Sequence, residues 1–233
     1  MDVAFLPGIA SGGPEAWRHL VRYLDSALPA FDIARARFLD LREPNGGFAD
    51  HAEWAVAGAS AARPVHVIAH SFGGNGALLA AQHYPELIAS LTLIEPAALA
   101  LTRHTAATEA HIAEVGPIFA SRADLDCTDS QLGYALLTAL GGRMHREDPL
   151  NEAVGRTMRQ AGAPWEAPLD RKWTMRVPTL VITGGWDDIY EDVAAHLESR
   201  GATHLVVPGA EHRPQDLPPA HRAIAAHLEA HSQ

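Results

Sequence analysis

The sequence has little of what several classes of protein require. Its 233 residues include one cysteine, Cys127, so no disulfide can form within the chain, which suits a reducing cytoplasm. No stretch approaches the roughly 20 consecutive apolar residues that a membrane span needs. The first residues carry no basic segment ahead of their apolar ones, as a signal peptide would. We therefore expect a cytoplasmic protein without a membrane-spanning helix.

Positive charge and metal-binding motifs are also scarce. The chain has 18 Lys and Arg residues against 28 Asp and Glu residues, a formal net charge of −10. Because binding to phosphate backbones needs a clustered basic surface, nucleic acid is not an expected partner. None of the 14 histidines stands in a helical zinc motif or in a Cys/His cluster with zinc spacing. We expect no metal and no organic cofactor.

The pattern of apolar residues is that of an α/β protein. A hydrophobic content of 47% and a charged content of 20% are ordinary for a globular chain, and the length fits one domain with an insertion. Strands are expected at residues 3–6, 33–41, 65–69, 91–94, 177–183 and 203–207. Helices are expected at residues 15–28, 51–62, 74–83, 191–199 and 220–231. This alternation predicts a mostly parallel sheet with helices on both faces and a ligand site beyond the carboxyl ends of the strands.

One long segment interrupts the alternation. Residues 97–171 contain no convincing strand but have helical stretches at 106–115, 130–140 and 151–160. We interpret this segment as a helical cap inserted into a core made of residues 1–96 and 172–233. Its apolar residues are candidates to line a pocket, although at helical spacing such residues more often form the core of the cap itself. The candidates are Ile118, Phe119, Leu132, Tyr134, Leu136, Leu137, Met144, Met158 and Trp165.

The most informative segment follows the strand expected at residues 65–69, where Ser71 stands between Ala69 and Gly73. A sharp strand-to-helix turn strains the backbone of the central residue, and small residues two positions away avoid collisions in it. Such a turn exposes the serine hydroxyl above the sheet edge and leaves the next main-chain N–H, that of Phe72, free to bind an anion. A serine in this kind of loop is otherwise a helix cap or a turn residue. The pattern favours a nucleophile and calls for partners elsewhere in the chain.

A serine nucleophile needs a base, and the base needs a group that orients it. His212 follows the strand expected at 203–207, and Asp187 follows the one at 177–183. A serine, an acid and a histidine in that chain order, each just beyond a strand end, make a specific coincidence.

The acid has more than one candidate. Asp187 is favoured, but Glu95 also stands directly after a strand, and Asp188 takes the place of Asp187 if the loop is offset by one residue. The alternative for Glu95 is a carboxylate at a helix start with Pro96 in the first turn, and for Asp187 an exposed turn residue.

With these motifs the sequence resembles the α/β-hydrolase superfamily over nearly its whole length. The matching segments are the nucleophile elbow at 69–74, the acid loop at 184–187, the histidine loop at 208–212 and the oxyanion loop at 6–13. The resemblance implies that the main-chain N–H of Ile9 joins that of Phe72 in an oxyanion hole. The chain departs from the pattern at Ala69, where glycine is usual, and at Pro7, where a histidine often precedes the glycine. We also expect the first two strands of the family to be missing, which leaves a sheet of about six strands.

The resemblance implies a serine hydrolase that cleaves a carboxylic ester or a related small acyl compound through an acyl-enzyme. Ser71 would be the nucleophile, His212 the base, and Asp187 or its alternatives the acid. A serine at the elbow argues against epoxide hydrolases and haloalkane dehalogenases, which carry an aspartate there. Two alternatives stay open because a fold does not define a reaction: a non-hydrolytic enzyme, such as a lyase or a cofactor-free haloperoxidase, and a small-molecule receptor.

Overall fold

The computed structural model describes residues 1–232, and its centre is one six-stranded sheet with the order β2-β1-β3-β4-β5-β6. The strands are β1 (Val3–Leu6), β2 (Arg37–Phe38), β3 (Val65–His70), β4 (Ile88–Ile94), β5 (Thr179–Thr183) and β6 (Thr203–Val206). Every neighbouring pair runs parallel. The parallel sheet of about six strands that the sequence predicts is confirmed.

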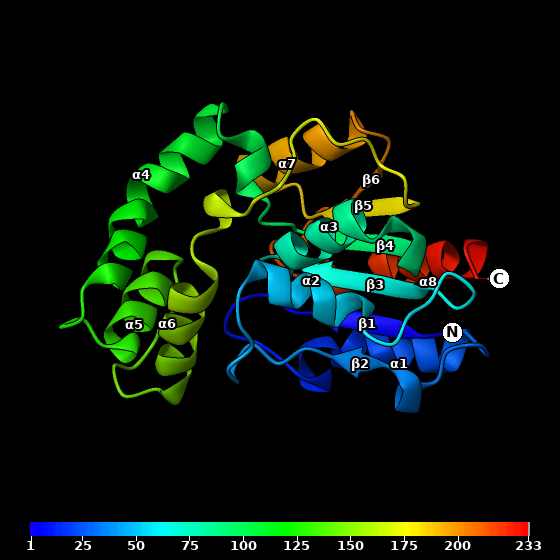
Figure 1. The fold of residues 1–233 in the computed structure, drawn as a ribbon, viewed down its shortest axis with the longest axis horizontal. Coiled ribbons are helices and arrows are strands. Elements are labelled where there is room, and N and C mark those ends of the chain that lie inside the picture. The colour runs from blue at the N-terminus through cyan, green and yellow to red at the C-terminus, as the bar shows by residue number, and fades with distance from the viewer. Residues whose placement is uncertain (233) are drawn as a thin grey trace.

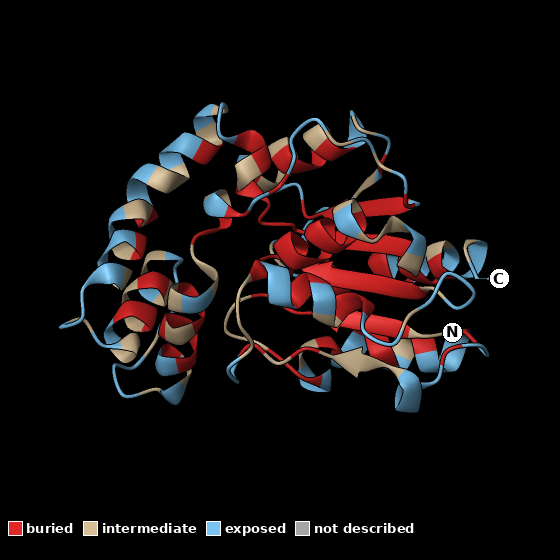
Figure 2. Cartoon of the chain, in the orientation of Figure 1, coloured by how far each residue is buried: buried red, intermediate tan, exposed pale blue. Residues whose placement is uncertain are grey.

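Helices cover both faces of the sheet, as expected (Figure 1). One face carries α1 (Arg18–Ala27) and α8 (Pro218–Ala230), and the other carries α2 (Phe48–Val56), α3 (Gly73–His83) and α7 (Asp188–Glu198). The central strands are buried from both sides (Figure 2), which explains their continuous apolar sequences. No helix among residues 1–232 is long and apolar enough to cross a membrane.

The prediction of a strand at residues 33–41 is mostly wrong. Residues Ile33–Arg35 form a 3₁₀ turn, and only Arg37 and Phe38 pair with β1. The carboxylate of Asp32 accepts a hydrogen bond from the N–H of Ala34 at 2.9 Å. This local bond stabilises a turn where the apolar alternation alone favours a strand.

The helix expected at residues 51–62 is also displaced, because α2 spans Phe48–Val56. It ends before Gly58, whose positive φ of 77° is incompatible with a continuing helix.

Three helices lie beside the sheet and not on its faces: α4 (Ala106–Ala120), α5 (Asp129–Ala139) and α6 (Pro149–Ala161) (Figure 1). They share a small apolar core of their own, formed by Val115, Phe119, Leu132, Leu136, Val154 and Met158. All three helices fall within residues 97–171, and no strand lies between β4 and β5 in this described part of the chain. The boundaries of the cap stay a prediction.

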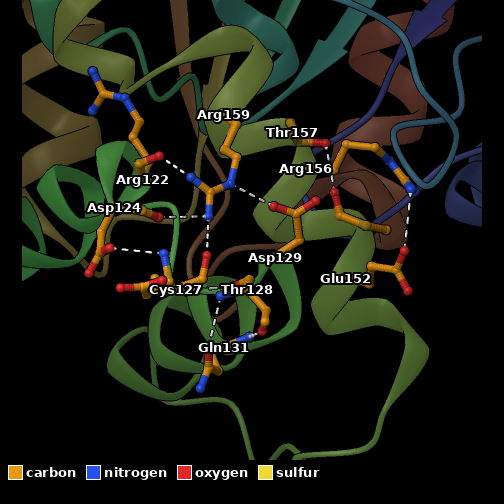
Figure 3. A network of polar contacts seen from close by, with 12 residues as sticks. Arg122, Asp124, Cys127, Thr128, Asp129, Gln131, Glu152, Arg156, Thr157 and Arg159 are labelled. Atoms are coloured by element: carbon orange, nitrogen blue, oxygen red, sulfur yellow. Dashed lines mark hydrogen bonds and ion pairs between the residues drawn. The ribbon is translucent and has the colours of Figure 1, made fainter.

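A polar network fastens these helices together (Figure 3). The guanidinium of Arg159, on α6, donates to Oδ1 of Asp129 at the start of α5, at 2.7 Å, and to the carbonyl oxygen of Cys127. On the same helix, the hydroxyl of Thr157 donates to the carbonyl oxygen of Leu41 at 3.2 Å. The cap is therefore held both internally and against the loop that follows β2.

The parallel register brings the ends of five strands to one edge of the sheet. Leu6 lies opposite Ala69, Ile94 lies opposite both His70 and Ile182, and Thr183 lies opposite Val206. The loops after β1, β3, β4, β5 and β6 therefore all leave the sheet on the side where a ligand site is expected.

Candidate active site

Ser71 forms a strained turn between β3 and α3. Its φ is 52°, in the left-handed region that residues with a side chain rarely adopt, and its N–H donates to the carbonyl oxygen of Ile94 at 2.9 Å. Gly73 is required beside it, because a Cβ there would lie only 2.5 Å from the carbonyl oxygen of Leu6. The sharp turn and the small flanking residue are as the sequence predicts.

His212, in the loop after β6, lies against this serine. Its Nε2 is 3.1 Å from Oγ of Ser71, within the range in which a base accepts a hydroxyl proton. The ring of Tyr190, from the first turn of α7, packs beside the imidazole with their centroids 4.8 Å apart. These contacts bring together two residues that are 141 positions apart in the sequence.

The carboxylate of Glu95 lies on the other side of this imidazole. Oε2 of Glu95 is 3.3 Å from Nδ1 of His212. The side chain is fully buried, and it also accepts the N–H of Gly184 at 2.6 Å and the indole N–H of Trp186 at 2.9 Å. A buried carboxylate needs such donors to replace water. With Nδ1–H directed at Glu95, the lone pair of Nε2 faces Ser71, a tautomer assigned from this hydrogen-bond pattern.

The structure corrects the position expected for Asp187. Its Oδ1 accepts the N–H of Ile189 at 3.1 Å and caps the start of α7, and Asp188 is an exposed residue in the first turn of that helix. A carboxylate is favourable there because it satisfies a free main-chain N–H at the positive end of the helix. The loop expected to supply the acid instead supplies two donors, from Gly184 and Trp186, to the carboxylate of Glu95, directly after β4. The helix-start role considered for Glu95 thus belongs to Asp187.

The two residues expected to supply the oxyanion hole, Ile9 and Phe72, line the same cavity as Ser71. Within residues 1–232, the main-chain N–H of neither residue donates a hydrogen bond to another protein group. The loop after β1 approaches closely because residue 8 is glycine; a Cβ there would lie 3.0 Å from Nδ1 of His70 and 3.3 Å from Cβ of Ser71. Both N–H groups are thus available to a ligand oxygen at the serine.

The cavity above Ser71 has a volume of about 60 Å³ and lies between the core and the cap. Its cap side is formed by His111, Phe119, Leu136, Leu140, Pro164 and Trp165. Three candidates named from the sequence, Phe119, Leu136 and Trp165, do line it. Among the others, Leu132 and Met158 are buried in the cap core, and the ring of Tyr134 packs under the guanidinium of Arg146 at 4.8 Å.

Two titratable residues of the cavity were not found from the sequence. Burial lowers the pKa of His111, against the opposing effect of the nearby Asp187 carboxylate, so this imidazole is neutral near neutral pH. Burial and the charge of Glu95 raise the pKa of Tyr190, which keeps its phenol protonated. No motif marks His111 among the 14 histidines. No group of three or more His, Cys, Asp or Glu side chains in the described residues is arranged to hold a metal.

His70 is a further residue whose position only the structure shows. It is buried beneath the histidine loop, and its Nε2 lies 2.8 Å from the carbonyl oxygen of His212, to which it donates. Burial holds the pKa of His70 well below its usual range, so the ring stays neutral beside His212. This contact joins the turn that carries Ser71 to the loop that carries His212.

The sequence itself matches the alpha/beta hydrolase family over residues 3–226. The chain belongs to this family. No curated protein matches it. Among solved structures, NosK from Streptomyces actuosus is 22% identical, with 99% of this chain and 98% of that chain covered and a TM-score of 0.59. A thermophilic esterase from Thermogutta terrifontis is 19% identical, with 100% and 91% covered and a TM-score of 0.61.

An epoxide hydrolase from Bacillus megaterium is 15% identical, with 97% of this chain and 93% of that chain covered and a TM-score of 0.61. Structures at this level of identity share the family fold, and the presence of both an esterase and an epoxide hydrolase among them shows that the fold by itself does not select one reaction.

Proposed function

We propose that this member of the alpha/beta hydrolase family is a serine hydrolase that cleaves carboxylic esters through an acyl-enzyme. The observation that carries the proposal is the continuous contact from Ser71 through His212 to Glu95, at 3.1 Å and 3.3 Å. A nucleophile, a base and an orienting acid in hydrogen-bonding sequence are the parts that covalent acyl transfer requires.

The first half of the reaction acylates Ser71. Its Oγ attacks the carbonyl carbon of the ester while Nε2 of His212 takes the hydroxyl proton. The bond between the carbonyl carbon and the alcohol oxygen then breaks, and His212 returns the proton to the departing alcohol. Glu95 stabilises the imidazolium that exists between these two transfers.

The second half returns the enzyme to its starting state. A water molecule gives a proton to His212 and attacks the acyl carbon, the bond to Oγ of Ser71 breaks, and Ser71 recovers its proton. In both halves the negative charge develops on the carbonyl oxygen, where the N–H groups of Ile9 and Phe72 would stabilise it. All proton transfers are thus carried by one imidazole.

The residue at the elbow supports ester hydrolysis over epoxide opening. Epoxide hydrolases of this superfamily place an aspartate at the elbow, whereas this chain has Ser71 at the strained position. A serine hydroxyl that has Nε2 of a histidine within reach forms an ester with the acyl group, and water then hydrolyses that ester.

The first test replaces the nucleophile. Ser71→Ala should lower the hydrolysis of a short p-nitrophenyl ester by about 10⁴-fold or more, because the remaining site lacks the attacking oxygen. A fluorophosphonate should label Ser71 in the wild-type protein and leave the variant unlabelled. Ser26→Ala, at an exposed position on α1, is the matched control and should keep full activity and labelling. Full activity in Ser71→Ala would overturn the proposal.

A further inference from the structure

The cavity over Ser71 restricts the acyl group that the proposed reaction accepts. Its volume of about 60 Å³ is small for a ligand site. Sites for drug-sized ligands hold about 300–1,000 Å³. A space of this size beside the nucleophile takes only a few heavy atoms beyond the reacting carbonyl.

The walls that limit this space are large side chains held by packing. Phe119 and Leu136 belong to the apolar core of the cap and are almost fully buried. The rings of Phe119 and Trp165 contact each other edge to face, with centroids 5.0 Å apart. An acyl chain that extends toward the cap must displace these side chains, and displacement from a packed core is costly.

The same walls offer no cationic side chain to pair with a negative charge. Within the described residues, no lysine or arginine lines the cavity; its polar side chains come from Ser71, His111, Tyr190 and the indole of Trp165. His111 is uncharged near neutral pH because burial lowers its pKa. Desolvating a carboxylate without a cationic partner is unfavourable.

We infer that the substrate is an ester of a short, uncharged carboxylic acid, with an acyl chain of a few carbons. This inference rests on the proposed serine hydrolysis and names the substrate class for it. The cavity volume limits the length of the acyl chain, and the absence of cationic lining residues excludes acyl groups that carry a second carboxylate.

The test is a panel of p-nitrophenyl esters that share one leaving group. The acetate and butyrate should be hydrolysed with kcat/KM about tenfold or more above the octanoate, since a methylene that does not fit changes kcat/KM by about that factor. The mono-p-nitrophenyl ester of succinic acid should be a poorer substrate than the butyrate, which has a similar length and no second charge. Equal or better hydrolysis of the octanoate or the succinate ester would overturn the inference.

Variants of the cavity wall test whether this cavity limits the length of the acyl chain. Leu136→Ala should shift the octanoate-to-acetate ratio of kcat/KM upward, because it enlarges the space above Ser71. Leu140→Ala should do the same with less risk to folding, since Leu140 lines the cavity but is half exposed. Leu125→Ala is the matched control, at an exposed position away from the cavity, and should leave the ratio unchanged. An unchanged ratio in folded Leu136→Ala and Leu140→Ala would show that another surface limits the chain.

Labelling separates this inference from the proposed function. If a fluorophosphonate fails to label Ser71 and no ester in the panel is hydrolysed, the serine hydrolase proposal fails. If Ser71 is labelled and the longer or charged esters are preferred, the hydrolase stands and only the substrate class is overturned.

Discussion

At the scale of single residues, the position of buried donors determines which carboxylate lies beside His212. Glu95 is fully enclosed and is reached by N–H groups from Gly184, Trp186 and His212. Asp187, only one residue beyond Trp186, instead satisfies the first turn of α7. Because an ionised carboxylate accepts hydrogen bonds and donates none, three converging donors define a site for a carboxylate and not for an amide.

We therefore expect Glu95→Gln to be the damaging change among three amide substitutions. An amide directs an NH₂ group at one of these donors and no longer orients the imidazole, so kcat/KM for p-nitrophenyl acetate should fall by about 10⁴-fold. Asp187→Asn should lose much less, since asparagine caps a helix about as well as aspartate. Asp188→Asn, at an exposed position, should be nearly neutral.

Thermal unfolding of each variant shows whether it is folded. If Asp187→Asn were the inactive variant and Glu95→Gln the active one, the contact between Glu95 and His212 would have no catalytic role.

At the scale of elements, the cap depends on two helices that cross at glycines. A Cβ on Gly133 of α5 would lie 1.9 Å from the carbonyl oxygen of Asn151, and one on Gly155 of α6 would lie 1.9 Å from that of Asp129. No side chain fits at these points, because the obstacle in each case is the main chain of the opposite segment. The close crossing also allows Arg159 to reach Asp129 across the two helices (Figure 3).

Gly133→Ala and Gly155→Ala should each destabilise the protein by about 1–3 kcal/mol or more, the usual cost of overpacking. Thr138→Ala, at an exposed position on α5, is the matched control. Alanine favours a helix over threonine, so this control should be unchanged or slightly more stable. Urea unfolding measures all three. Equal stability of Gly133→Ala and Thr138→Ala would show that α5 and α6 separate without cost.

At the scale of the whole molecule, buried histidines couple stability to pH. Burial lowers the pKa of His51, His66 and His227 to about 4, from 6.5 in the unfolded chain. Between these two values the unfolded chain binds protons that the folded protein does not. The part of the unfolding free energy that depends on these neutral histidines is therefore fully present above about pH 6.5 and is lost as the pH falls toward 4.

His51 offers a direct test of this effect. Its Nε2 donates to Oδ1 of Asn45 at 2.7 Å, a bond that the side-chain amide of glutamine can also donate. In His51→Gln the loss of unfolding free energy on going from about pH 7 to pH 5 should be smaller, by of the order of 1 kcal/mol per pH unit within the window. His145→Gln, at an exposed position, is the control and should follow the wild-type curve. Identical curves for all three proteins would show that His51 does not contribute to the pH dependence.

Much of the fold, and the turn at Ser71 within the site, can be predicted from local sequence. Apolar periodicity indicates the strands from β3 to β6 and the helices that cover them, because periods of two and of 3.6 residues differ within a few positions. Ser71 is marked by its own turn, since the small residues it requires lie within two positions of it. Where a local hydrogen bond competes with the apolar pattern, as at Asp32, the expected strand is wrong.

The tertiary structure decided between candidate residues that local sequence does not distinguish. Glu95, Asp187 and Asp188 all follow strands that end at one edge of the sheet, so only the path of residues 184–186 determines which carboxylate lies beside His212. The lining of the cavity is decided in the same way. Phe119 and Tyr134 are both aromatic residues on cap helices, and the packing of α4, α5 and α6 places only Phe119 above Ser71. Such choices depend on contacts between segments far apart in the chain, which no local pattern encodes.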